Sequence, residues 1–236
     1  MRRHASRRAD VDDSTTNRVS ILQHLVRGME VPHTMITLYH SPLLRSTRIY
    51  WLLEELGLPF RVETIVQTSM KSPEYLKVHP LGKIPAIQDG DLTMFESGAI
   101  LEYILEKYGN GRLAPAPGTA ARPLFLQWVH FAEATALPPI ADFIDHTFFR
   151  PEAERVPAVV VYSRTRAAAV LGMLEQTLAG KQYLLGAEFT AADIMMGITL
   201  LGAKWHALLS DAYPNVLTYI ERLERRPALQ KALEAW

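Results

Sequence analysis

The stretch GKIPAIQDGDLTMFESGAI, residues 82–100, places a proline inside an apolar run and a Glu-Ser pair directly before a helical pattern. The Asp89-Gly90 step between two apolar runs is a strong signal for a β-hairpin. Pro85 cannot donate a hydrogen bond to a neighbouring strand, so it is expected at a sheet edge, a strand start or a bulge. The stretch therefore predicts two antiparallel strands that lead straight into a helix.

The same stretch could hold both ends of an α-amino acid. If the bond before Pro85 is cis, the N–H and C=O of Ile84 can turn outward and pair with an extended peptide. The unpaired N–H groups of a helix start, with the Ser97 hydroxyl, suit a carboxylate, and Glu96 can accept hydrogen bonds from an ammonium group. Taken singly, an edge proline and a helix-capping serine are the ordinary interpretation. Their order along the chain favours a binding site.

The flanking sequence predicts one small mixed sheet. An apolar run from Met35 is expected to be a strand, residues 45–57 a helix, and residues 58–66 a second strand. This strand–helix–strand succession implies a right-handed parallel crossover. With a short helix opened by Ser72-Pro73 and the hairpin, the order is βαβ-α-ββα, which a mixed four-stranded sheet with helices packed on it accounts for.

Strand signals end at a Pro- and Gly-rich stretch, and the remaining segments are predicted to be helices interrupted by Pro and Gly. We therefore expect an α+β domain over 35–112, a linker over 113–120 and an all-helical domain over 121–236. Residues 1–34 are rich in Arg, Ser and Asp. This N-terminal segment is expected to be a disordered extension or a mis-assigned gene start, with Met35 as the initiator.

Composition excludes several classes of function. The 236 residues carry 25 Lys and Arg against 25 Asp and Glu, so no net charge recruits nucleic acid or an anionic membrane. Apolar runs are too short to span a bilayer. The absence of cysteine excludes disulfides, thiolate metal sites and a protein thiol nucleophile, and it fits a reducing compartment such as the cytoplasm. The eight histidines form no zinc-binding helix pattern, so no metal site is expected.

Two segments resemble a known family. HPLGKIPAIQDGDLTMFESGAILEYI, residues 79–104, is similar to the glutathione-binding segment of the cytosolic glutathione transferases. YLLGAEFTAADI, residues 183–194, resembles the folding motif of their helical domain, and its Thr190-x-x-Asp193 spacing has the form of a structural capping box. The resemblance implies a thioredoxin-like domain followed by a helical one, glutathione as co-substrate, a hydrophobic electrophile as acceptor, and a cytoplasmic homodimer that acts in detoxification.

The resemblance also implies which residues bind glutathione. They are Lys71, Lys83, Ile84, Pro85, Glu96 and Ser97. The main chain of Ile84 would pair with the cysteinyl part of glutathione, and Glu96 and Ser97 would hold its γ-glutamyl end. Lys71 and Lys83 would lie near the glycyl carboxylate, although solvated surface charges are their ordinary interpretation.

The residue that activates the glutathione thiol is less evident. A free thiol has a pKa of roughly 8.5, so the protein must stabilise the thiolate with a hydroxyl group, a helix N-terminus or a cation. The run Arg45-Ser46-x-Arg48 resembles the helix start of a bacterial and fungal subgroup. The hypothesis is Ser46, supported by Arg45 and the helix dipole, with Ser41 second, because Tyr39 falls too early, inside the strand.

Other functions stay open. One alternative is a non-catalytic binding or regulatory module of the same fold; another is a glutathione-dependent peroxidase or dehalogenase that uses the same thiolate. Trp128, Phe131, Trp205 and His206 are candidates for an acceptor pocket, with core packing as their ordinary role. A direct thiol–disulfide oxidoreductase is disfavoured because the chain contains no cysteine.

Overall fold

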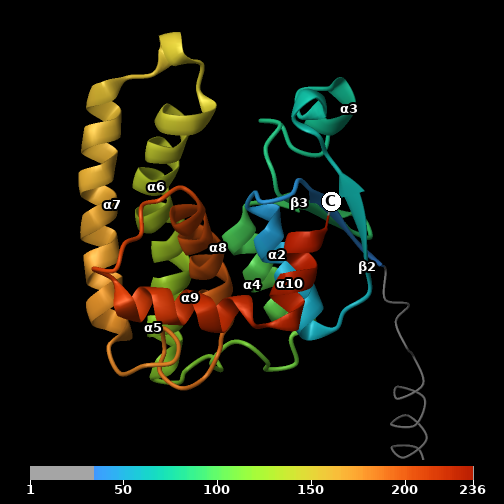
Figure 1. Cartoon of the computed structure of the whole chain (residues 1–236). Helices are drawn as coiled ribbons and strands as arrows, with labels where there is room; N and C mark the ends of the chain where they lie inside the picture. Colours follow the sequence, from blue (N-terminus) through green and yellow to red (C-terminus); the bar gives the residue numbers. More distant parts are fainter. Residues whose placement is uncertain (1–34, 236) are drawn as a thin grey trace, which may run out of the picture. The chain divides into compact units, whose positions relative to one another are not determined.

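The computed structural model describes residues 35–235, and from Met35 onward the chain forms one compact unit. The predictions for residues 1–34 lie outside the described residues. Within the compact unit, a small sheet with its helices adjoins a part made only of helices (Figure 1).

The sheet confirms the predicted βαβ-α-ββα order. Its strands are β1 (Ile36–His40), β2 (Phe60–Thr64), β3 (Ala86–Asp89) and β4 (Leu92–Phe95). The strand order is β2-β1-β3-β4, with β1 and β2 parallel and both other pairs antiparallel. The helices of this part are α2 (Ser46–Leu56), α3 (Pro73–Leu76) and α4 (Ser97–Tyr108), with a 3₁₀ turn at Gln67–Ser69.

Everything described beyond α4 is helix, turn or loop, apart from one isolated bridge. The α-helices are α5 (Ala121–Phe131), α6 (Leu137–Ile144), α7 (Pro157–Leu178), α8 (Ala191–Trp205), α9 (Pro214–Glu224) and α10 (Pro227–Glu234). Two π-helical segments, η2 (Ala132–Ala136) and η3 (Asp145–Phe149), flank α6, and a 3₁₀ turn lies at Glu152–Glu154. Proline is the first residue of α7, α9 and α10. An N–H at this position makes no intrahelical hydrogen bond, so the lack of one in proline costs the helix nothing.

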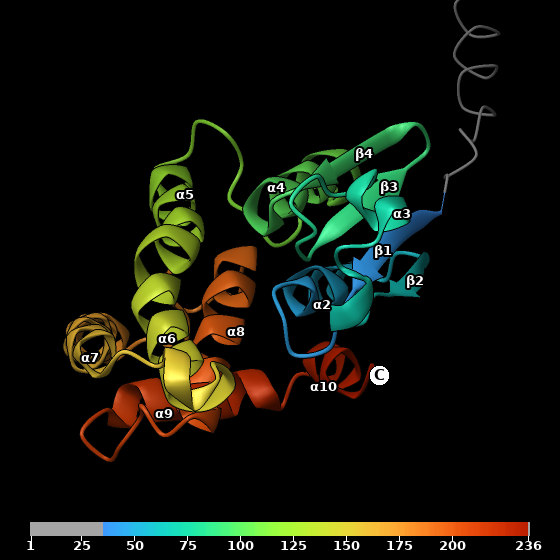
Figure 2. The same cartoon turned by 90° about the horizontal axis from the view of Figure 1, so that it is seen from above.

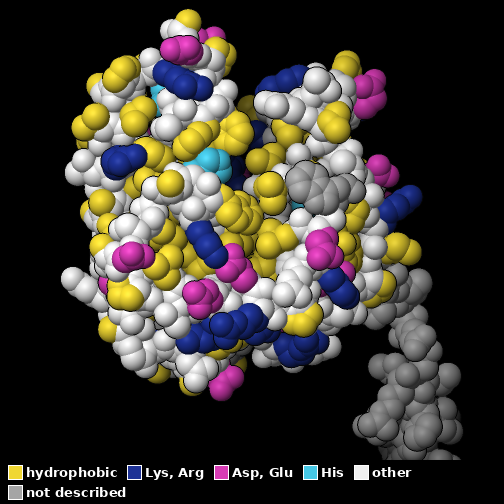
Figure 3. Space-filling model, viewed as in Figure 1, with side chains coloured by type: hydrophobic (Ala, Val, Ile, Leu, Met, Phe, Trp, Pro, Cys, Tyr) yellow, Lys and Arg dark blue, Asp and Glu magenta, His cyan; other side chains and the backbone are white. Residues whose placement is uncertain are grey.

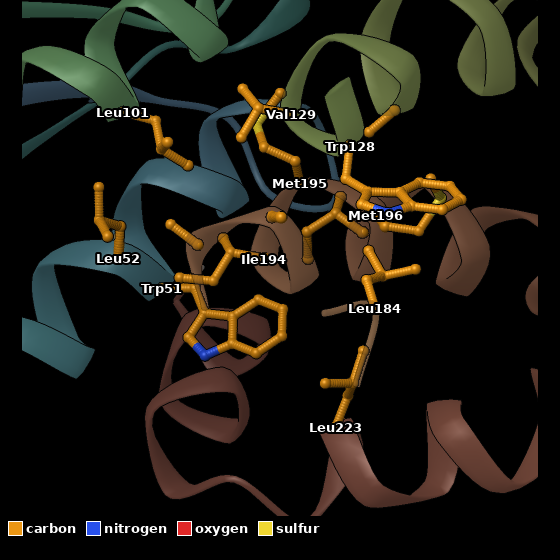
Figure 4. Close-up of a cluster of buried hydrophobic side chains, with 14 of the residues drawn as sticks. Trp51, Leu52, Leu101, Trp128, Val129, Leu184, Ile194, Met195, Met196 and Leu223 are labelled. Atoms are coloured by element: carbon orange, nitrogen blue, oxygen red, sulfur yellow. The ribbon is translucent and has the colours of Figure 1, made fainter. Parts of the chain in front are cut away.

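Helix α2 is the centre of the packing. It contacts β1, α4, α8 and α10, and Figure 2 shows α10 lying beside it. Trp51 of α2 is fully buried together with Leu101 of α4 and Met195 of α8 (Figure 4). A Cβ added to Gly197 of α8 would lie only 3.0 Å from the Trp51 ring, so the two helices approach closely. One apolar core therefore runs through both parts of the molecule.

The predicted capping box at the start of α8 is confirmed. Asp193 is buried and accepts hydrogen bonds from the Thr190 N–H at 2.8 Å and the Leu184 N–H at 2.9 Å. The Tyr219 hydroxyl donates a further bond at 2.9 Å. Burial raises the pKa of Asp193, and these donors oppose that shift. The role of this motif is structural, because its carboxylate ties α8 to the preceding loop and to α9.

Candidate functional site

Ile84 lies just before β3 with its main chain available for pairing. The Ile84–Pro85 peptide bond is cis. No hydrogen bond between described residues reaches the N–H or the C=O of Ile84, whereas its side chain is buried. The backbone groups of Ile84 can therefore accept and donate bonds to an extended ligand, as the sequence predicts for this position.

Side chains from the preceding loop hold this segment in place. The Tyr75 hydroxyl donates to the Lys83 carbonyl at 2.6 Å, and the Lys71 ammonium donates to the Leu81 carbonyl at 2.7 Å. His79, which the sequence analysis left without a role, accepts a bond from the Leu81 N–H through Nδ1 at 3.2 Å. Lys71 and Lys83 are both exposed. An ammonium group has three donors, so Lys71 keeps two for other acceptors.

Gly82 is required at its position in this loop. Its φ is +55°, a conformation that residues with a Cβ rarely adopt. A Cβ there would also lie 2.0 Å from the Met70 carbonyl oxygen. The absence of a side chain thus lets the loop before Ile84 pass directly against the loop that carries Lys71.

Glu96 and Ser97 stand at the N-terminus of α4. Glu96 has φ 75° and ψ 110°, a strained conformation for a residue other than glycine, and its side chain is exposed. Strain of this kind costs about 1–3 kcal/mol and occurs preferentially at functional sites. No acidic side chain lies in the first turn of α4, and no cap bond reaches it. The first N–H groups of the helix are therefore available to an anion.

A fully buried arginine orients Ser97. Arg48 of α2 donates from Nη1 to the Ser97 hydroxyl oxygen at 3.0 Å and to the Glu133 carboxylate, and from Nη2 to the Thr199 hydroxyl at 2.8 Å. Burial lowers the pKa of Arg48, and Glu133 counteracts this effect. An arginine can only donate, so Ser97 accepts this bond and keeps its own proton for a ligand. Within residues 35–235, no other group accepts that proton.

Glu133 belongs to the helical part and comes from the π-helical segment η2. Its other carboxylate oxygen lies 3.4 Å from Nε of Arg45, so one carboxylate joins two arginines of the β1–α2 region. π-helical turns are rare and are frequently found at functional sites. The helical part therefore takes part in building this site.

The activation candidates lie on the turn after β1 and at the first residue of α2. Ser46 is buried; its hydroxyl donates to the Ser41 carbonyl at 3.0 Å and accepts from the Ser41 N–H at 3.1 Å. Ser41 itself is half-buried, and the hydrogen bonds among the described residues leave its hydroxyl without a partner. Arg45 is partly exposed and paired with Glu133. The structure thus brings Ser41, Ser46 and Arg45 together, with Ser46 bracing the backbone of Ser41.

The acceptor candidates divide into two groups. Trp128 packs in the core, as its ordinary role predicts, and its ring contacts Phe131 with centroids 5.3 Å apart. His206 instead lies against two exposed rings, Phe148 at 5.1 Å and Phe149 at 5.7 Å between centroids. Apolar side chains gather around the hollow between the end of the α6–α7 pair and the α3 region (Figure 3). Trp205, next to His206, is also exposed.

Between residues 35 and 235, no group of three His, Asp or Glu side chains could hold a metal ion. None of the helices described there has the length and apolarity needed to cross a membrane.

Comparison with known proteins identifies both parts of the chain. The family "Glutathione S-transferase, N-terminal domain" matches residues 34–106, and "Glutathione S-transferase, C-terminal domain" matches residues 141–235. Glutathione S-transferase 3 of Schizosaccharomyces pombe is 32% identical over 211 residues, which cover 85% of this chain and 87% of that protein. Glutathione S-transferase 3 of Zea mays is 32% identical over 209 residues, covering 85% of this chain and 94% of the relative.

Solved structures agree in fold. The glutathione transferase URE2P6 from Phanerochaete chrysosporium, in complex with oxidized glutathione, superimposes with a TM-score of 0.77 at 31% identity and covers 87% of this chain and 97% of its own. A family member from Pseudomonas fluorescens with two glutathione bound gives a TM-score of 0.78 at 28% identity. The match covers 89% of this chain and 96% of that one. With both family descriptions matched and relatives above 30% identity over most of their length, the chain belongs to the glutathione S-transferase family.

Proposed function

We propose that this protein binds glutathione across Ile84 and the N-terminus of α4 and activates its thiol for attack on a hydrophobic electrophile. The observation that carries the proposal is the Arg48–Ser97 hydrogen bond at 3.0 Å. Because the Ser97 oxygen accepts this bond, its buried hydroxyl can donate its proton to a ligand. The ligand would lie at a helix start that has no acidic side chain in its first turn.

Each part of glutathione has a counterpart in this site. The γ-glutamyl carboxylate accepts from the Ser97 hydroxyl and the first N–H groups of α4, and its ammonium group donates to the exposed Glu96 carboxylate. The cysteinyl unit pairs with the main chain of Ile84. The glycyl carboxylate lies near Lys71 and Lys83, where two exposed cations favour an anion.

We favour Ser41 over Ser46 as the donor that stabilises the thiolate. The Ser46 proton is already bonded to the Ser41 carbonyl. Ser41 follows directly after β1, and its hydroxyl has no hydrogen-bond partner among the described residues. Ser46 then acts by fixing the backbone of Ser41, while Arg45 and the N-terminus of α2 add positive potential.

The test is the ultraviolet absorbance of the thiolate of bound glutathione, measured against pH. We expect the bound thiol of the wild-type protein to ionise at least one unit below the free value of roughly 8.5. Ser41→Ala should return the thiol to the free value while glutathione remains bound. Ser210→Ala, at an exposed serine, is the matched control. An unshifted thiol in the wild-type complex would favour the non-catalytic binding module.

A disulfide is a second candidate for the acceptor. URE2P6 was solved with oxidized glutathione and the Pseudomonas relative with two glutathione molecules. In such a reaction the bound thiolate attacks the glutathionyl sulfur of a mixed disulfide, a new S–S bond forms glutathione disulfide, and the other thiolate leaves. No protein cysteine is needed, in agreement with a chain that has none. Release of a small thiol from its mixed disulfide with glutathione is the assay for this alternative.

Assembly, location and domain limits are further parts of the proposal. By likeness to its family, we propose a cytoplasmic homodimer, which light scattering of the purified protein measures directly. The proposed domain limits stay at 35–112 and 121–236, with a linker over 113–120.

A further inference from the structure

His79 connects the two halves of the proposed glutathione site. Its ring is buried, and its Nδ1 accepts from the Leu81 N–H at 3.2 Å. The ring also stacks on Phe95, with centroids 4.6 Å apart and an interplanar angle of 33°. Leu81 precedes Ile84 by three residues, and Phe95 directly precedes Glu96. One imidazole therefore joins the loop that presents the Ile84 main chain to the strand that leads into the helix start.

This geometry requires a neutral ring. Because Nδ1 accepts a hydrogen bond, the proton of neutral His79 resides on Nε2. Protonation would convert Nδ1 into a second donor that faces the Leu81 N–H, so the bond between them would be lost. Burial lowers the pKa of His79, which keeps the ring neutral near pH 7.

The charges around His79 come from the same site. The Glu96 carboxylate favours protonation of the ring, whereas the ammonium groups of Lys83 and Lys71 oppose it. Glu96 and Lys83 belong to the two segments that His79 joins, and Lys71 lies on the loop that packs against the Ile84 segment at Gly82. A change in its protonation state therefore acts on the residues proposed to contact glutathione.

We propose that His79 is a positioning residue for glutathione: its neutral imidazole keeps the Ile84 main chain and the start of α4 at the spacing that glutathione spans. Protonation in mildly acidic solution releases the Leu81 segment from the ring and weakens glutathione binding. This inference rests on the proposed glutathione site.

Two substitutions at His79 separate the effect of the hydrogen-bond acceptor from the effect of protonation. In His79→Asn, Oδ1 is the same number of bonds from Cα as Nδ1 and can accept the Leu81 N–H, but it does not titrate. His79→Leu fills similar space and removes the acceptor. Both variants retain Glu96, Lys71 and Lys83, so any pH effect of those groups appears in all three proteins.

Titration calorimetry with glutathione at pH 7.5 and pH 5.5 is the measurement. We expect wild-type affinity to fall at the lower pH by at most about five- to tenfold, the cost of one hydrogen bond of typical strength, because the lowered pKa of His79 leaves part of the rings neutral there. His79→Asn should bind within about twofold of wild type at pH 7.5 and equally well at pH 5.5. His79→Leu should bind about five- to tenfold more weakly at both values.

Three results would overturn the inference while leaving the glutathione site standing. They are wild-type affinity that is unchanged at pH 5.5, wild-type affinity that is tighter there, and an Asn variant that follows the wild-type pH profile. Failure of the folded wild-type protein to bind glutathione at pH 7.5 would overturn the proposed function itself. Circular dichroism at both pH values verifies that each protein remains folded, and the Asn variant keeps the test decisive even if His79→Leu does not fold.

Discussion

Replacing Arg48 with methionine tests whether the buried guanidinium orients Ser97. The substitution keeps an unbranched chain of similar length in the space beside Ser97 and removes every donor. Three acceptors lose their bonds at once: the hydroxyls of Ser97 and Thr199, and the carboxylate of Glu133. Both stability and glutathione affinity should therefore fall.

The expected size of each effect follows from burial. Removing one partner of a buried ion pair costs about 3–5 kcal/mol. The lower end of this free-energy range applies, because the Glu133 side chain is 30% exposed and water can solvate the carboxylate left behind. For a protein of this size, about 3 kcal/mol lowers the melting temperature by roughly 6–12 °C. Loss of the fixed Ser97 proton removes about one hydrogen bond to the ligand, or roughly a tenfold rise in Kd.

Calorimetric melting and glutathione titration provide the two readouts, and Thr199→Val is the matched control. It deletes the 2.8 Å bond between Arg48 and α8 without touching Ser97, so it should cost about 1–3 kcal/mol of stability and leave glutathione affinity unchanged. If Arg48→Met melts lower but binds glutathione as tightly as the wild-type protein, Arg48 does not act through Ser97 and the reasoning is refuted.

Two further predictions concern the loop before Ile84. Tyr75→Phe removes the 2.6 Å bond to the Lys83 carbonyl and should weaken glutathione binding about three- to tenfold by calorimetry. Burial raises the pKa of Tyr75 to about 12, so this difference should persist from pH 7 to 9, and its disappearance at pH 9 would contradict the assignment. Gly82→Ala should weaken binding more strongly, because its Cβ would lie 2.0 Å from a carbonyl oxygen. The control Gly111→Ala carries a similar backbone strain but meets nothing within 4 Å. Equal glutathione affinities for the two alanine variants would rule out the steric explanation.

The parts of the fold that were predictable depend on local signals. The Asp89-Gly90 step fixed the hairpin, the alternation of strand and helix patterns fixed the sheet order, and the Thr190–Asp193 spacing fixed the start of α8. Each of these features involves residues a few positions apart, where turn and capping chemistry decides the conformation.

The polar interior of the site was not predictable in the same way. The Arg48–Glu133 contact joins residues 85 positions apart, on helices whose packing no local pattern specifies. One signal was present, because Arg48 lies four residues before Leu52 and therefore shares its buried face of α2. A cation on an apolar helix face needs an anion, although the sequence does not say which one. The positive φ of Glu96 could not be predicted either, since the usual sequence signal for a positive φ is glycine and this position carries none.

These contacts make the proposed glutathione site dependent on both parts of the molecule. Arg48 is fully buried, and without Glu133 from the helical part its charge would face an apolar environment at a cost of several kcal/mol. The same guanidinium donates to Ser97 in the sheet-containing part, so one side chain bonds both the Glu133 carboxylate of η2 and the Ser97 hydroxyl. The continuous core, with the Trp51 ring close to Gly197, couples this packing to the folding of α8. We therefore expect any change that loosens the packing of the helical part to weaken glutathione binding as well.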